Sequence, residues 1–305
     1  MVFFASFGAI KEVFFSVVLS LALVFFVLFF ARRRFFFVSL RKSERVRGFL
    51  PVSLAELLFP FAFYLFSIVF ISNLLFFFMR FFLKQTENTY PFSEYARLLH
   101  SLLIQIITGF SFLFVCRRRQ RDVFLSFFGN ISRRGKLFYA LRKIFEGMKS
   151  WLFVFPFVLF SKSLTDLIVL ILWPYSESVD QTAVHYVKIS LSYPLIFAVW
   201  TIVLVALTPI IEEVLFRGFL QTYLKRYLSP MGSILLSSLI FSLFHFSSSQ
   251  GYENIKILTA LFVFSCFLAY LYEAHRSLWV SIGLHGCFNG ISVFVIYLSH
   301  SQVFF

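Results

Sequence analysis

The sequence has little charge, and it is especially poor in acidic residues. Only 14% of its 305 residues are charged, and 28 Lys and Arg outnumber 14 Asp and Glu. Hydrophobic residues make up 60% of the chain, which includes 49 Phe, and the mean hydropathy is +0.86. A soluble globular domain does not need so much apolar surface, so this composition predicts a membrane protein.

Cysteine is scarce, and its placement excludes two further classes of structure. Cys116, Cys266 and Cys287 lie in or beside apolar stretches, without the spacing of metal ligands or of a disulfide framework. No Gly/Ser linker, proline-rich tract or internal repeat divides the chain. We therefore expect one unit, in which residues 1–150 form an amino-terminal transmembrane extension and residues 151–305 form the core.

Long apolar stretches fill most of the sequence. A transmembrane helix needs about 20 apolar residues, and about eight stretches approach this length, which predicts an all-α polytopic membrane helix bundle. The first stretch is not expected to be a cleavable signal peptide, because arginines and no small-residue cleavage site follow it. The expected segments are Val13–Ala31, Leu57–Met79, Leu98–Cys116, Trp151–Trp173, Ser192–Leu224, Gly232–Phe246, Ile255–Tyr272 and Leu278–Leu298.

Basic residues gather in two of the connecting loops. Arg32–Arg47 and Arg117–Lys149 hold most of them, whereas Ser176–Lys188 carries Glu177 and Asp180. The positive-inside rule places the two basic loops in the cytoplasm and Ser176–Lys188 outside, with both termini outside. The net charge of +14 therefore predicts no nucleic-acid partner. It fits a multi-pass protein of a plasma membrane, or of the inner membrane if the source is bacterial.

One basic loop contains an amphipathic stretch. Between Leu137 and Met148 apolar residues share one helical face, and basic residues occupy the rest. This pattern predicts a helix that lies on an anionic leaflet. An ordinary connecting helix is the alternative.

Two adjacent glutamates stand near the end of an apolar segment. Glu213 and Arg217 are four residues apart, so they share a helical face and can form an ion pair. Glu212 points about 100° away and has no local cation, which leaves it free to act as a general acid or base. The alternative is an ion-paired helix end at the membrane surface.

Two later apolar segments each contain polar residues at helical spacing. Phe241 lies one turn before His245 and can hold its imidazole, and His285 shares a face with Asn289. Ionisable groups in a membrane segment are costly, and their default interpretation is functional. A His beside Glu212 can help to deprotonate a water, and a His with an Asn can stabilise an oxyanion. A single intramembrane His can also be an interhelical hydrogen-bonding residue.

Taken in order, these three motifs resemble the CPBP intramembrane protease family, which includes type II CAAX prenyl endopeptidases and bacteriocin-processing, Abi-like proteins. The resemblance covers about Ser192–Leu298. It implies that Glu212 and His245 activate a water and that His285 and Asn289 stabilise an oxyanion. It also implies supporting roles, which fall to Glu213, Arg217 and Phe241.

The need for a metal remains open at this stage. The His-Glu-x-x-His pattern of zinc proteases is absent, but Glu212, His245 and His285 could converge around a zinc ion. We favour a site without a metal or other cofactor, because Asn289 and a free glutamate suffice for water activation and oxyanion binding.

Three classes of function fit these observations. The first is an intramembrane endopeptidase whose substrate is a membrane-associated peptide or protein. The second is a non-catalytic membrane partner or immunity-like protein. The third is a proton-coupled transporter, in which Lys162 and Asp166 join Glu212 along a pathway. The lack of an inverted repeat and of paired interrupted helices speaks against transport.

Overall fold

The computed structural model describes residues 2–31, 51–82, 94–129, 135–174 and 181–301, and the regular elements in these ranges are all helical. Seven of the described helices are long and apolar enough to cross a membrane. The predicted polytopic helical bundle is therefore confirmed. The candidate spans are Ile10–Phe29, Leu54–Phe81, Glu94–Arg119, Lys136–Leu172, Pro194–Leu224, Glu253–His275 and Leu278–His300.

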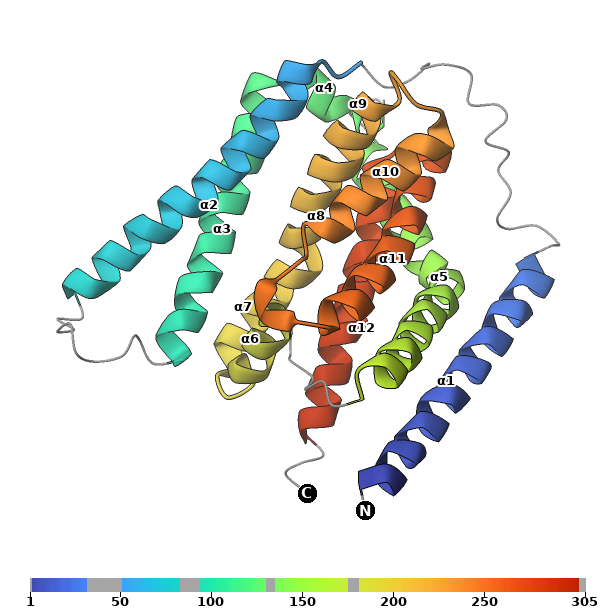
Figure 1. Cartoon of the computed structure of the whole chain (residues 1–305). Coiled ribbons are helices and arrows are strands. Elements are labelled where there is room, and N and C mark those ends of the chain that lie inside the picture. Colours follow the sequence, from blue (N-terminus) through green and yellow to red (C-terminus); the bar gives the residue numbers. More distant parts are fainter. Residues whose placement is uncertain (1, 32–50, 83–93, 130–134, 175–180, 302–305) are drawn as a thin grey trace.

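Successive long helices run toward opposite ends of the bundle (Figure 1). The segment Pro194–Leu224 is one continuous helix, in which two π-helical stretches, η3 and η4, alternate with α-helical ones. In chain order the elements are α1 (Val2–Ala31), α2 (Leu54–Phe82), α3 (Glu94–Arg119), α4 (Arg121–Ser126), α5 (Lys136–Leu172), α6 (Thr182–Ser190), α7 (Pro194–Ile202), η3 (Val203–Leu207), α8 (Thr208–Glu213), η4 (Val214–Gln221), α9 (Thr222–Leu224), α10 (Pro230–Leu243), the 3₁₀ turn η5 (Ser248–Gln250), α11 (Glu253–His275) and α12 (Leu278–Ser301).

The segment expected at Gly232–Phe246 is the exception among the predicted spans. It forms α10, which begins at Pro230 behind a Ser229 cap and ends at Leu243. Its 14 residues extend about 21 Å, whereas the hydrocarbon core of a bilayer is about 30 Å thick. The eighth helix is therefore present, but it is shorter than a full span.

The amphipathic stretch Leu137–Met148 does not form a separate surface helix. It is the beginning of α5, which runs without interruption from Lys136 to Leu172. Gly147, inside this stretch, packs so closely on α12 that a Cβ there would collide with the Val280 carbonyl. The separate helix that the pattern suggested is therefore not formed: Ala140 and Gly147 are buried, whereas Leu137, Phe138 and Leu141 remain exposed.

Glycine allows close helix crossings around α12. A Cβ at Gly283 would collide with the carbonyl oxygen of Ile144 on α5. On another face of α12, a Cβ at Gly286 would come within 2.5 Å of the Val205 carbonyl oxygen. Missing side chains let the backbones approach here, as in small-residue helix interfaces in membranes. α12 is thereby held between α5 and the helix that carries the glutamate pair.

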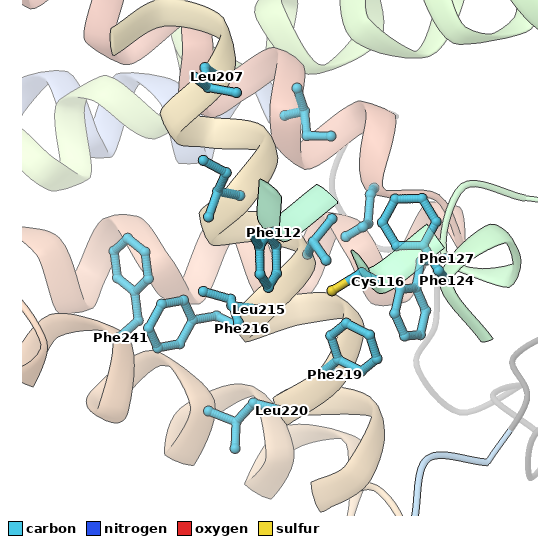
Figure 2. Close-up of a cluster of buried hydrophobic side chains, with 14 of the residues drawn as sticks. Phe112, Cys116, Phe124, Phe127, Leu207, Leu215, Phe216, Phe219, Leu220 and Phe241 are labelled. Atoms are coloured by element: carbon cyan, nitrogen blue, oxygen red, sulfur yellow. The ribbon is translucent and has the colours of Figure 1, made fainter. Parts of the chain in front are cut away.

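Aromatic residues fill the core beside the glutamate helix. Phe112 and Cys116 from α3 face Phe216 and Phe219 from η4, and Phe127 follows α4 (Figure 2). The Phe127 and Phe219 rings lie edge to face, with their centroids 4.9 Å apart. This packing fixes the rotation of the helix that places Glu212 and Glu213.

One end of the bundle collects the basic side chains. We call it the basic end; α3, α9 and α11 finish there, and α4 and α5 begin there. Its described basic residues include Arg117, Arg118, Arg119, Arg121, Lys136, Lys225, Arg226 and Arg276. Arg226 donates to the Val52 carbonyl at 3.0 Å, and Ser277 donates to the Phe128 carbonyl at 3.2 Å, so these connections lie together. The expected loop Arg32–Arg47 lies outside the described residues. In the expected loop Ser176–Lys188, residues 176–180 also lie outside them, and the described part belongs mainly to the helix α6.

Candidate active site

The two glutamates lie where the helix changes between α and π geometry. Both belong to α8, with η3 before them and η4 after them. A π-helical turn shifts the register of side chains along a helix, and such turns are frequent at functional sites. The two carboxylates have different surroundings, because the Glu213 side chain is fully buried and that of Glu212 is 20% exposed.

Glu213 forms the buried ion pair that the sequence spacing predicts. Its Oε1 lies 3.1 Å from Nη1 of Arg217, whose side chain is also fully buried. Arg217 donates to Ser265 Oγ at 2.8 Å, and its guanidinium lies 4.4 Å from the centroid of the Phe241 ring. Phe241 therefore supports the arginine as well as the histidine that follows it.

His285 lies between the two glutamates. Its Nδ1 is 2.8 Å from Glu213 Oε1, and its Nε2 is 3.6 Å from Glu212 Oε2. The ring of Phe264 meets it edge to face, with centroids 5.5 Å apart. When Glu213 is ionised it only accepts, so Nδ1 of His285 carries a hydrogen. The ring then donates from Nε2 only as an imidazolium.

His245 lies just beyond the end of α10 rather than inside a helix. Its Nδ1 is 3.0 Å from the Phe241 carbonyl, which can only accept, so Nδ1 is the donor. In the neutral ring Nε2 is then an acceptor, and it lies 3.9 Å from Glu212 Oε1. The Phe241 and His245 rings are 4.8 Å apart, as the spacing predicts.

Asn289 is anchored by the irregular backbone before the glutamates. Its side-chain nitrogen donates to the Leu204 carbonyl in η3 at 2.8 Å. An amide nitrogen carries two hydrogens, so one remains for a second acceptor. Asn289 can therefore donate to another group without losing its anchor.

One cavity of about 690 Å³ is lined by Glu212, His245, His285 and Asn289 together. These side chains come from α8, the end of α10, and α12. The remaining wall is mostly apolar, with a few polar groups from α3, α5, α8, α11 and α12 and from Gln181, which precedes α6. A mainly apolar cavity with a few convergent polar groups is typical of a ligand-binding or active site.

Charged residues of α5 and α11 also lie at the cavity, and one of their contacts joins the two helices. Lys162 donates to Asp166 at 2.9 Å on α5, as their spacing indicates. Lys256 of α11 lies 3.6 Å from the same carboxylate and donates to Glu253 at 2.7 Å. Sequence reasoning also missed Ser265 and the Leu204 carbonyl, because both contacts depend on how separate helices pack.

The zinc-ligand set offered by the sequence does not fit the observed geometry. Within the described ranges no three His, Cys, Asp or Glu side chains are grouped so that they could hold a metal ion. His285 turns Nδ1 to Glu213 at 2.8 Å, and the Nε2 atoms of His285 and His245 lie 3.6 and 3.9 Å from the Glu212 carboxylate.

The fold and the site together define a multi-pass helical membrane protein with a polar Glu/His/Asn cluster inside its bundle. Residues 194–291 match the family model described as Type II CAAX prenyl endopeptidase Rce1-like. The match covers about a third of the chain and includes all four residues of the cluster. No curated protein and no solved structure matched the chain.

Proposed function

We propose that the protein is an intramembrane endopeptidase that hydrolyses a peptide bond in a membrane-associated substrate. The observation that carries this proposal is the meeting of Glu212 with His245 and His285 in one cavity, at 3.9 and 3.6 Å. The Rce1-like match over residues 194–291 supports the same reaction class.

The nucleophile in this proposal is a water held by Glu212 and His245. A separation of 3.9 Å is too long for a direct hydrogen bond, and one water can bridge it. The water donates one hydrogen to Glu212 and the other to Nε2 of His245, which is the acceptor nitrogen of the neutral ring. Its lone pair is then free to face the substrate.

Hydrolysis follows by general acid and base catalysis. Glu212 takes a proton from the water as its oxygen bonds to the carbonyl carbon. The spare N–H of Asn289 donates to the resulting oxyanion, and His285 adds a second donor in its imidazolium form. When the C–N bond breaks, the proton on Glu212 passes to the leaving nitrogen. The products are a carboxylic acid and an amine, and Glu212 is regenerated.

The supporting residues have positioning roles in this scheme. Glu213 fixes the orientation of the His285 ring at 2.8 Å, and Arg217 compensates the charge of Glu213. Phe241 contacts both Arg217 and His245, so it couples the ion pair to the residue that holds the water.

Glu212→Gln tests the function most directly. The substitution keeps the size of the side chain and removes the base. Membranes from cells that express either chain are compared for new peptide termini by mass spectrometry. We expect termini that appear with the wild-type chain and not with Glu212→Gln or His245→Gln.

Glu146→Gln on α5 is the matched control. Glu146 pairs with Arg142 and Lys143 and does not line the cavity, so its substitution should leave the termini unchanged. Termini identical in wild-type and Glu212→Gln cells would refute hydrolysis and favour a non-catalytic membrane partner. Purified active protein should lack stoichiometric zinc and resist chelators; zinc that is lost in His285→Ala would overturn the metal-free mechanism.

A further inference from the structure

The cavity extends from Glu212, His245, His285 and Asn289 toward one end of the bundle. On α12 its lining residues run from His285 to Ile296, which is about 16 Å along the helix and away from the basic end. On α11, which runs in the opposite sense, they extend from Phe264 back to Glu253. The cluster of Glu212, His245, His285 and Asn289 therefore lies at the deep end of the cavity. The mouth of the cavity faces the end of the bundle that is opposite the basic end.

Packing closes the other direction. Toward the basic end, Phe216, Phe219 and Tyr272 are buried, and so is Gln221. A second cavity, of about 870 Å³, lies at the basic end between Arg117, Lys136 and Trp279, but it includes none of the four cluster residues. The two cavities share no lining residue, so the second cavity does not connect the cluster to the basic end.

The shortness of α10 points to the same side. It begins at the basic end and stops after about 21 Å, so that His245 and the following turn lie at membrane depth. Irregular backbone is tolerated there only where protein or a water-filled cavity covers it. Asn254 binds this turn, since it accepts from Ser247 N at 3.0 Å and donates to Ser247 O at 2.7 Å.

Charge at the mouth indicates that water reaches it. The ion pairs of Lys162 with Asp166 and of Lys256 with Glu253 lie on α5 and α11. Charged side chains in membrane segments face a bundle interior or a water-filled cavity. The mouth is therefore a polar opening, through which water and a polar peptide segment can reach Glu212.

We propose that the site receives its substrate from the extracytoplasmic side. The positive-inside rule assigns the basic end to the cytoplasm, so the mouth of the cavity opens on the outer face. The substrate class is a membrane-anchored peptide whose scissile bond lies in the outer half of the bilayer, with a polar flank at the charged mouth. This assignment rests on the proposed protease function for its substrate, but not for the direction of the cavity.

Thiol labelling separates the two sides. Ser292 lines the cavity and is exposed, and Ser126 lines the second cavity at the basic end. Ser292→Cys and Ser126→Cys are made in a chain in which Cys266 and Cys287 are replaced by alanine; Cys116 is fully buried and is kept. Each full-length variant is treated with a membrane-impermeant maleimide in intact cells and in inside-out vesicles.

We expect Ser292→Cys to be labelled in intact cells at least about tenfold faster than in inside-out vesicles, and Ser126→Cys to show the reverse order. Labelling of Ser292→Cys from the cytoplasmic side alone would overturn the proposal, and so would failure to label it from either side. Adding Glu212→Gln should leave the labelling unchanged, because access does not require catalysis. Outside labelling without Glu212-dependent peptide termini would leave the direction intact and remove the protease function.

Discussion

At the scale of single residues, two neighbouring carboxylates have different partners and therefore different capacities. Glu213 is fully buried and is held by both Arg217 and His285. Glu212 faces the cavity, and the Nε2 atoms of His245 and His285 lie 3.9 and 3.6 Å from its carboxylate, beyond hydrogen-bond distance. Only Glu212 can take up and release a proton without breaking a buried ion pair.

Asn289→Ala should lower kcat by about 100- to 1000-fold, as expected for the loss of one oxyanion donor. KM should change little, because the lost bond forms mainly in the transition state. Steady-state hydrolysis of a cleaved substrate peptide measures both constants. Asn73→Ala is the matched control, since Asn73 is exposed on α2 and donates only to Val69 of its own helix. An equal effect of both substitutions would contradict the proposed role.

Glu213→Gln should act through stability. It leaves the Arg217 charge buried without its counter-ion, which costs about 3–5 kcal/mol in proteins. The melting temperature of the purified protein in detergent should therefore fall. Adding Arg217→Met removes the stranded charge and should restore part of the loss. A double variant no more stable than Glu213→Gln alone would show that the ion pair is not the cause.

Some of these residue contacts follow from the sequence, and others do not. The Glu213–Arg217 pair and the Phe241–His245 contact depend on residues four apart, and that spacing is readable from the chain. The bond from Asn289 to Leu204 depends on a π-helical stretch and on the approach of two distant helices. No periodicity in a single sequence contains that information.

At the scale of helices, the crossing of α5 and α12 fixes the position of His285 along the axis of the bundle. Gly147 and Gly283 face the backbone of the partner helix from opposite sides of this crossing. The sequence predicts both helices as apolar segments. For α5, however, it predicts a span that begins only at Trp151, whereas the helix begins at Lys136. The reason is that the basic face of Lys136–Lys149 obscures the buried contact that Gly147 makes.

Gly283→Ala should destabilise the protein by about 1–3 kcal/mol, the usual cost of overpacking. The new Cβ meets the Ile144 carbonyl, which is backbone and cannot rotate away. Thermal unfolding in detergent measures the loss. Gly135→Ala is the matched control, because a Cβ there meets nothing within 4 Å. Equal melting temperatures for the two variants would contradict the close backbone contact between Gly283 and Ile144.

At the scale of the whole molecule, the amino-terminal helices differ in how they meet the rest of the chain. α1 packs against α5, where Ser16 and Ser163 form a hydrogen bond of 2.9 Å. α2 and α3 cover the glutamate helix, with the Phe61 and Phe216 ring centroids 5.6 Å apart. The division at residue 150, which the sequence suggested, falls inside α5 and remains a proposal.

Deletion of residues 2–31 should therefore be tolerated, while deletion of residues 2–126 should not. Among the described side chains that line the cavity, none comes from α1, so we expect a loss of activity below about tenfold, or about 1.4 kcal/mol in activation free energy. The shortened chain keeps Arg32–Arg47, which still holds the start of α2 in the cytoplasm and preserves the orientation of the later helices. The longer deletion removes α2 and α3 and exposes Phe216 and Phe219, so that chain should not accumulate in the membrane. Immunoblots of membrane fractions and Glu212-dependent cleavage measure both outcomes. Complete inactivation of a stable chain that lacks only residues 2–31 would show that α1 takes part in the site.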